Sequence, residues 1–343
     1  MDVRRVLVSV RRGVYSAAAG AILVAPLTVT REVHATGSCE RLRGLTLQEH
    51  AAVVDARAVA ADTAPFFAAR AFCRVFVTIA PTPNSDIKSE VWLPLRDWNQ
   101  KYQAVGNADA AGVLSYDAML AAIRGGYATS STDTGHVGNT MAFALGHRDK
   151  YVDFGYRAVH EMTVSAKAIV DAFYGTAPVQ SYWNGCSQGG RQGLTEAVRY
   201  PADFDAIVAG APAIAHMQLH AARLALHAFV HRDDDSAIPP GKYAAIHRAA
   251  LNVCDALDGV ADGLIAQPST CRFDPAILEC RSGDGPTCLT PAQVETARGM
   301  YAPVTDPATG QVVSDALLQP GSELGWGRLA GTEPLEVCAL HRW

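Results

Sequence analysis

The sequence lacks an excess of positive charge. Its 343 residues contain 29 lysines and arginines against 34 aspartates and glutamates, which gives a formal net charge of −5. A chain without a basic surface has no electrostatic footprint for nucleic acid or for an anionic membrane, so neither kind of partner is expected. Hydrophobic residues make up 49% of the chain and charged residues 18%, which are values typical of a globular protein and exclude a disordered one.

Repeats and zinc-type cysteine spacings are also missing. The only biased tract is the short acidic run 233–235, which is expected to be a solvated turn. The eight cysteines contain no Cys-x-x-Cys pair and no nearby pair of histidines, so a zinc site is not favoured. Eight cysteines instead suit an oxidising compartment.

The one long apolar stretch lies at the N-terminus. Four arginines between positions 4 and 12 precede an alanine-rich run over 13–29, and the small residues around Ala35 offer a cleavage site. This layout predicts a secretory signal peptide over 1–35 and a secreted or periplasmic protein. An uncleaved membrane anchor is the alternative, but Pro26 and the charge of Glu32 leave the apolar run short for a bilayer.

Between Phe72 and Pro212 the chain alternates short apolar runs with helical runs. This rhythm is typical of an α/β fold with a mostly parallel sheet and helices on both faces. The expected strands are 75–79, 89–93, 101–105, 127–131, 179–183 and 206–210, and the expected helices are 118–124, 156–174 and 191–198. After Ala213 the pattern changes to helical runs over 216–229 and 243–253, followed by loops rich in Gly, Asp, Pro and Cys.

The most informative motif is the Gly-x-Ser-x-Gly sequence at 185–189, which places Ser187 between an expected strand and an expected helix. A serine in such a sharp turn needs small neighbours, because nothing bulky fits against the strained backbone. The N-terminus of the following helix supplies free N–H groups and a positive dipole end, which stabilise an oxyanion. Short patterns of this kind also occur by chance in loops, but the flanking strand and helix favour a nucleophilic serine.

Several segments resemble the tannase and feruloyl esterase family of α/β-hydrolases. They are Gly185-Cys186-Ser187-Gln188-Gly189-Gly190-Arg191-Gln192, the run from Arg199 to Ala213, Phe72-Cys73-Arg74, the runs 81–87 and 90–94, and Ser131-Thr132-Asp133-Thr134-Gly135-His136. The resemblance runs from about Cys39 to about Gly327. It implies an α/β-hydrolase core over 36–213 and an inserted, incomplete lid domain over 214–343.

The resemblance also implies roles for individual residues. Ser187 is expected to attack an ester carbonyl and form an acyl-enzyme, while Gln188 donates its backbone N–H to the oxyanion. A second donor is expected in the loop 106–112, where Ala108 is the candidate. This loop departs from the consecutive glycines that the family favours, and the carboxylate of Asp109 would repel a developing oxyanion. An oxyanion loop and an ordinary surface loop therefore both stay open.

A second constellation follows Cys254, where three aspartates and two turn-forming glycines lie close together. Closely spaced carboxylates repel one another unless a cation offsets their charge, and oxygen ligands favour Ca²⁺ over a transition metal. The spacing is not that of an EF-hand, so an exposed acidic turn is the alternative. The resemblance implies a structural calcium loop in which Asp255, Asp258 and Asp262 bind through side chains and Val260 and Leu264 through backbone carbonyls.

Two cysteine pairs, 254 with 271 and 280 with 288, are separated by short loops of a kind that disulfides commonly close. The resemblance implies the pairings Cys39–Cys73, Cys254–Cys271 and Cys280–Cys288. Cys186 and Cys338 are left without an assigned partner.

Asp133 and His136 supply two residue types of a catalytic triad, but both precede Ser187, whereas hydrolases of this fold run serine, acid, histidine. They are expected to hold a loop near the site by hydrogen bonding. The later histidines are expected to be solvated or packed on lid helices. They are His216, His220, His227, His231 and His247, and His341 near Cys338 is a further, less favoured candidate.

The sequence therefore predicts a secreted carboxylic-ester hydrolase that acts on small aromatic esters, such as feruloyl or galloyl esters, through a serine acyl-enzyme. In the resembled family the catalytic aspartate and histidine lie beyond the lid, and no convincing pair follows Ser187 here. The alternative expectation is a truncated, catalytically inactive remnant stabilised by calcium.

Overall fold

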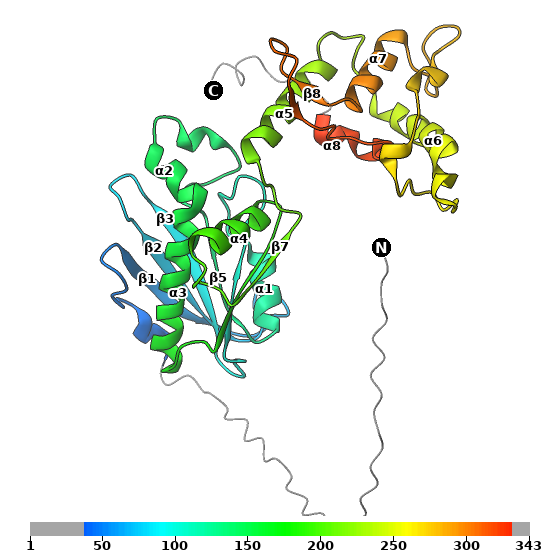
Figure 1. The fold of residues 1–343 in the computed structure, drawn as a ribbon. Helices are drawn as coiled ribbons and strands as arrows, with labels where there is room; N and C mark the ends of the chain where they lie inside the picture. The colour runs from blue at the N-terminus through cyan, green and yellow to red at the C-terminus, as the bar shows by residue number, and fades with distance from the viewer. Residues whose placement is uncertain (1–37, 331–343) are drawn as a thin grey trace, which may run out of the picture.

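The computed structural model describes residues 38–330 of the chain (Figure 1). The expected signal peptide, His341 and Cys338 lie outside the described residues. None of the helices in the described part is long and apolar enough to cross a membrane.

A seven-stranded mixed sheet forms the first part of the molecule, with the strand order β1-β2-β3-β5-β4-β6-β7. The strands are β1 (Ala51–Val59), β2 (Phe72–Ile79), β3 (Ile87–Pro94), β4 (Lys101–Val105), β5 (Ala128–Thr132), β6 (Gln180–Cys186) and β7 (Ala206–Gly210). The pairs β5·β4, β4·β6 and β6·β7 are parallel, whereas β1·β2, β2·β3 and β3·β5 are antiparallel. The parallel half carries the expected motif, because β6 ends just before Ser187.

Helices cover both faces of this sheet, as the sequence predicts. Side chains of a strand alternate between faces, so Val91 and Trp92 of β3 enter different hydrophobic clusters. The cluster with Val91 contains Met162 and Ile169 of α3, and the cluster with Trp92 contains Met119 of α1. The helices of this part are α1 (Tyr116–Arg124), α2 (Arg148–Val152), α3 (Ala158–Tyr174) and α4 (Gln188–Arg199), and a π-helical turn (Asp153–Arg157) joins α2 to α3.

Most expected elements are present, and 101–105 and 206–210 match β4 and β7 to the residue. Strand β1 was not predicted. It is rich in alanine, which is depleted in strands, and a register shift between Val53 and Asp55 interrupts the alternation along it. The pattern also did not separate the antiparallel strands β1 to β3 from the parallel ones.

Residues 214–330 form a second unit, here called the helical region, which Figure 1 shows joined to the sheet through α5. It contains α5 (His216–Val230), α6 (Tyr243–Cys254), α7 (Pro291–Met300), α8 (Trp326–Ala330) and a two-stranded ribbon of β8 (Val304–Thr305) and β9 (Val312–Ser314). The helical region has its own hydrophobic cluster, in which the fully buried Trp326 packs with Leu226, Ile246 and Val294.

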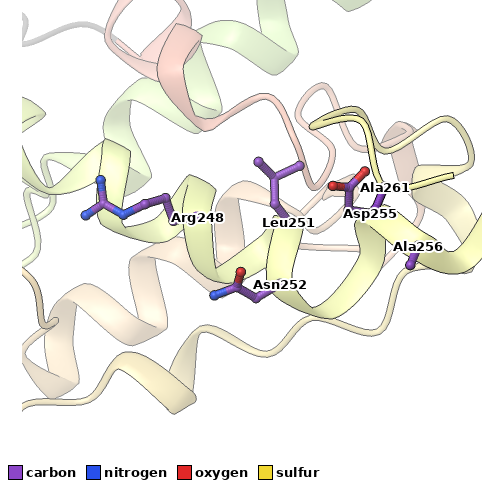
Figure 2. Close-up of a pocket in the computed structure, with 6 residues that line it drawn as sticks. All are labelled: Arg248, Leu251, Asn252, Asp255, Ala256 and Ala261. Carbon is purple, nitrogen blue, oxygen red and sulfur yellow. The ribbon is translucent and has the colours of Figure 1, made fainter.

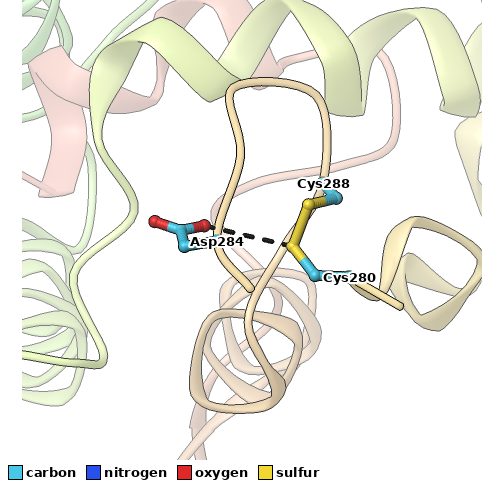
Figure 3. Close-up of side chains that lie close together, drawn as sticks. All are labelled: Cys280, Asp284 and Cys288. Carbon is cyan, nitrogen blue, oxygen red and sulfur yellow. Dashed lines mark hydrogen bonds between the residues drawn. A yellow bond between two sulfur atoms is a disulfide. The ribbon is translucent and has the colours of Figure 1, made fainter. Parts of the chain in front are cut away.

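Within residues 38–330, three disulfides are formed, with the pairings that the family resemblance implies. Cys39–Cys73 fixes the N-terminal turn to β2, and Cys254–Cys271 and Cys280–Cys288 close loops in the helical region. Figure 3 shows Asp284 beside the Cys280–Cys288 bond, with the sulfur of Cys280 4.0 Å from Asp284 Oδ1. Because the two sulfurs bind each other, these three residues do not form a thiolate metal site.

Candidate active site

Ser187 lies in a sharp turn between β6 and α4, as the motif predicts. Its backbone has φ 59° and ψ −115°, a left-handed conformation that is strained for a residue with a side chain. Neighbouring backbone groups hold this conformation: Ser187 N–H donates to Gly210 O at 2.9 Å, and Ser187 O accepts from Ala213 N–H at 3.1 Å. The residue is exposed, so its hydroxyl is accessible.

The glycines around Ser187 allow a close approach of three backbone segments. A Cβ atom at Gly185 would lie 2.5 Å from Gly189 O, and one at Gly106 would lie 2.5 Å from the Cα of Gly189. Neither position therefore accepts a side chain without a backbone shift. The close contact brings the loop after β4, which begins at Gly106, directly against the Ser187 turn.

The two proposed oxyanion donors lie on either side of this contact. Gln188 is the first residue of α4, so its N–H has no partner within the helix. Ala108 is exposed in the loop after β4. A cavity of about 810 Å³ is lined both by this loop, from Gly106 to Asp109, and by the end of β6, from Asn184 to Cys186. The side chain of Asp109 is exposed, and water screens its charge there. The role of Ala108 stays a prediction.

A reciprocal amide pair anchors this loop to the helix of Ser187. Asn107 N–H donates to Gln192 Oε1 at 3.1 Å, and Gln192 Nε2 donates to Asn107 Oδ1 at 2.9 Å. Asn107 Nδ2 also donates to the carbonyls of Val113 and Thr132. Both amides are buried, and their partners lie 85 positions apart. Sequence patterns could not reveal this pair, because no local spacing links the two residues.

Arg191 ties the first turn of α4 to the π-helical turn. Its guanidinium donates to the carbonyls of Gly155 at 3.0 Å and Phe154 at 3.2 Å, and its Nε donates to Gln188 Oε1 at 3.1 Å. The guanidinium also lies over the Phe154 ring, 5.1 Å from its centroid. Burial lowers the pKa of Arg191. These bonds fix the position of the residue that follows Ser187.

Asp133 and His136 hold the loop after β5, and their side chains do not bond to each other. Asp133 Oδ1 accepts N–H groups from Lys88 at 2.9 Å and Gly135 at 2.8 Å, while burial raises the pKa of Asp133 to about 6. The His136 ring stacks on Phe143 with centroids 3.6 Å apart, and burial lowers its pKa. Both residues act within the loop rather than on Ser187, as expected.

The later histidines of the described chain contact groups other than Ser187. Nε2 of His216 and Nε2 of His220 are 3.1 Å apart on α5, and His247 Nδ1 donates to the buried Glu323 at 2.8 Å. The His227 and His231 rings pack against each other with centroids 4.5 Å apart. Within residues 38–330, no hydrogen bond to the Ser187 hydroxyl is formed.

The expected calcium loop begins where α6 ends (Figure 2). Asp255 Oδ1 accepts N–H groups from Asp262 and Gly263, both at 3.2 Å, and Asp258 Oδ1 accepts from Val260 at 2.9 Å. Figure 2 shows Asp255 beside Ala261, at a groove of about 460 Å³ that also reaches Arg248.

The oxygen-rich donor set of this loop fits Ca²⁺, and the Cys254–Cys271 disulfide brackets it. In the described part of the chain, however, the three carboxylates do not gather with all their ligand atoms within 4.8 Å of one another. Backbone N–H groups hold them instead. Calcium binding stays a prediction.

Cys186 precedes Ser187 and is exposed, and it forms no disulfide with another described residue. Sequence reasoning also missed a partly buried cluster, in which Glu196 of α4 lies close to His160 and Asp203.

Comparison with known proteins identifies the relatives of this chain. The sequence profile of the family described as tannase and feruloyl esterase matches residues 73–333. An uncharacterized esterase of Xanthomonas campestris pv. campestris is 40% identical over 244 residues, which cover 70% of this chain and 42% of that protein. A probable feruloyl esterase B-2 of Aspergillus flavus is 38% identical over 255 residues, which cover 74% of this chain and 48% of that protein. The chain thus spans about half the length of these curated relatives.

The crystal structure of feruloyl esterase B from Aspergillus oryzae superimposes with a TM-score of 0.77 at 31% sequence identity. The match covers 86% of this chain and 61% of that one. The mixed sheet with helices on both faces is accordingly of the α/β-hydrolase type, as the sequence predicted. From its sequence motifs, its fold and its relatives, the chain belongs to the tannase and feruloyl esterase family.

Proposed function

We propose that this chain is a secreted carboxylic-ester hydrolase that acts on aromatic esters of the feruloyl or galloyl type through an acyl-enzyme at Ser187. One observation carries the proposal. Ser187 is exposed at a strained strand-to-helix turn, next to a helix N-terminus whose first N–H has no partner within the helix. The names of the relatives, which include esterases and feruloyl esterases, support the substrate class.

The proposed chemistry follows from the positions of these groups. The Ser187 oxygen attacks the ester carbonyl carbon, and the carbonyl oxygen becomes an oxyanion that accepts hydrogen bonds from Gln188 N–H and Ala108 N–H. The tetrahedral intermediate collapses by releasing the alcohol, and water then hydrolyses the acyl-serine. The proton of the serine hydroxyl must go to a base, and the described residues do not supply one in contact with Ser187.

The helical region would act as a lid, with a structural Ca²⁺ in the loop from Asp255 to Leu264. Its three carboxylates would hold the ion, together with the carbonyls of Val260 and Leu264, whose side chains are exposed. The loop has no contact with Ser187, so the ion would stabilise the fold and take no part in the reaction. Disulfides in both units support an oxidising compartment outside the cytoplasm.

A second candidate is a calcium-stabilised protein that binds aromatic esters without hydrolysing them. The absence of a hydrogen bond to the Ser187 hydroxyl within residues 38–330 favours it, because an unactivated hydroxyl is a weak nucleophile at neutral pH. A fluorophosphonate probe separates the two candidates. Hydrolysis predicts labelling at Ser187 and turnover of methyl ferulate, whereas an intact, folded chain that shows neither supports the binding protein.

A further inference from the structure

A buried carboxyl group lies near the far end of the helix that follows Ser187. Glu196 of α4 has no exposed surface, and within the described chain no donor reaches either of its carboxyl oxygens. An ionised carboxylate in this position would leave a full negative charge without solvation or a partner, which strongly disfavours the charged form. The proposed reaction does not use this residue.

A second carboxyl group lies close to Glu196. A carboxyl oxygen of Glu196, one of Asp203 and a ring nitrogen of His160 all lie within 4.8 Å of one another. The Asp203 carboxylate already accepts a hydrogen bond from His160 Nδ1 at 2.7 Å. The side chains of Asp203 and His160 are 13% and 28% exposed, so both are partly open to water.

The other ionisable groups around the cluster do not neutralise Glu196. The ammonium group of Lys167 on α3 donates a hydrogen bond to the backbone carbonyl of Asp203. On β4, the buried Tyr102 hydroxyl is hydrogen-bonded to the Ser130 hydroxyl at 2.6 Å. At the end of α4, Arg199 lies over the Tyr156 ring, 4.0 Å from its centroid. The remaining groups are Tyr200, which stacks on His160, and Asp205, which accepts the Ser181 N–H.

Two carboxylates this close together repel each other strongly when both are ionised and one of them is buried, so one keeps a proton. Glu196 is the more deeply buried of the two and has no donor, whereas Asp203 is already bonded to the His160 ring. We propose that Glu196 is a neutral carboxylic acid at physiological pH, and that it donates a hydrogen bond to Asp203 and so fixes α4 against α3. Burial, followed by the charge of Asp203, raises the pKa of Glu196 to about 9.

This bond would make Glu196 a positioning residue for Ser187. Ser187 caps the N-terminus of α4, nine residues before Glu196, which is about 13 Å along the helix axis. A strained turn persists only where its surroundings fix it. Arg191 and Gln192 anchor the first turn of α4, and the Glu196–Asp203 bond would anchor its last turn. This consequence for Ser187 rests on the proposed hydrolase function, whereas the protonation of Glu196 does not.

The first test is the pH dependence of stability in Glu196→Gln, whose amide mimics the neutral acid. Folding raises the pKa of Glu196 from its ordinary value of 4.5 to about 9, so between these pH values the folded state holds one more proton than the unfolded state. This proton makes the folding equilibrium constant fall up to tenfold per pH unit as the pH rises. Denaturant unfolding of the wild type should show this loss of stability with rising pH, and Glu196→Gln should lack it. The stability of the variant relative to the wild type should therefore increase as the pH rises.

The matched control is Glu295→Gln, because Glu295 also lies on a helix but is exposed and pairs at 2.7 Å with Arg298, and an arginine stays charged over this pH range. The stability of this control variant relative to the wild type should not increase between pH 6 and 9 as that of Glu196→Gln does. Parallel curves for wild type and Glu196→Gln would overturn the proposal. Infrared spectra give a direct check: a carboxylic-acid C=O band at neutral pH should be present in the wild type and absent from Glu196→Gln.

A bound cation is the competing explanation of the cluster, since one imidazole and two carboxylates also suit a divalent metal. Titration with Zn²⁺ or Mn²⁺ tests it. A rise in melting temperature in the wild type that Glu196→Gln abolishes would show a metal site and overturn the proton-sharing pair, and no rise in either protein supports the pair.

The effect on Ser187 has a separate readout. With methyl ferulate, Glu196→Gln should keep the neutral-pH kcat and retain it at higher pH than the wild type, whereas Glu196→Ala should lower kcat at every pH. Loss of kcat in the glutamine variant as well would contradict the positioning role. A wild type without any turnover would overturn the proposed function, while the stability and infrared tests of Glu196 would still stand.

Discussion

The sheet-based core and the helical region of this molecule are stabilised by different means. In the core, large side chains such as Trp92, Trp183 and Tyr102 are fully buried between the sheet and its helices. The helical region has a smaller cluster around Trp326, and large apolar side chains of its loops, such as Leu257 and Leu264, are exposed. It carries two disulfides that close loops over separations of 17 and 8 residues.

The difference shows how a protein compensates for a small core. Burial of apolar surface supplies most of the folding free energy, and a region of few long elements buries less of it. Disulfides, and in our proposal a calcium ion, then supply what burial does not. The proposed chemistry is divided as well, because the Ser187 turn lies in the core, whereas two of the three disulfides of the described chain lie in the helical region.

The largest expected effect concerns the proposed nucleophile in the sheet-based core. Ser187→Ala should remove any ester hydrolysis, by on the order of a million-fold where the serine is activated, because the covalent step needs the hydroxyl. The folded state should stay intact, since the hydroxyl forms no hydrogen bond with another described residue. Turnover of methyl ferulate and circular dichroism of the same samples measure both.

Ser187→Gly is the matched control for strain at this position. It should be as inactive as Ser187→Ala but more stable than it, by about 1 kcal/mol, because glycine adopts a φ of 59° without strain. An alanine variant that keeps most of the wild-type turnover would show that Ser187 is not the nucleophile.

The next largest effect concerns the stability of the helical region alone. Replacing both Cys254 and Cys271 by serine should lower the free energy of unfolding by about 3 kcal/mol, because the disulfide restricts a loop of 17 residues in the unfolded chain. The loss should be seen in the fluorescence of Trp326. If the fluorescence of the core tryptophans changed at a lower denaturant concentration than that of Trp326, the proposed difference between the two regions would be wrong. Cys186→Ser, at an exposed cysteine, should have little effect.

Removal of calcium should act on the same region. At a hundredfold excess over its dissociation constant, an ion bound only to the folded state contributes about 2.7 kcal/mol. EGTA should therefore lower the melting temperature of the wild type but not that of Asp258→Ala. Asp234→Ala, at another exposed aspartate of the helical region, should respond as the wild type does. An EGTA-insensitive wild type, with calcium removal confirmed, would disprove the site.

The smallest effect tests the tight packing of the core. A Cβ at Gly193 would lie 2.6 Å from Cδ1 of Trp183 and 3.0 Å from Cγ2 of Ile207. Gly193→Ala should therefore destabilise the core by about 1–3 kcal/mol, measured by chemical unfolding. Gly241→Ala in the helical region is the control, because nothing lies within 4 Å of its added methyl group. Equal losses in both variants would contradict the difference in packing.

Much of the parallel half of the sheet could be predicted, because local patterns fix it. The runs that became β4 and β7 are short, apolar and bounded by turn residues, and the Gly-x-Ser-x-Gly motif marks the junction of β6 and α4. Strand β1 could not be predicted in this way. Its alanines and its register shift hide the alternation, and only pairing with β2 over eight positions makes it a strand.

The sequence by itself determined the Ser187 turn, the order of core and helical region, and the candidate calcium loop, because each depends on residues that are close together in the chain. Only the tertiary structure decided which distant groups meet. The Asn107–Gln192 amide pair and the Glu196–Asp203–His160 cluster join elements that no spacing relates. The physical reason is that burial and hydrogen-bond geometry act on positions in space, so a carboxyl becomes neutral or an amide becomes an anchor only once the packed fold has removed the water around it.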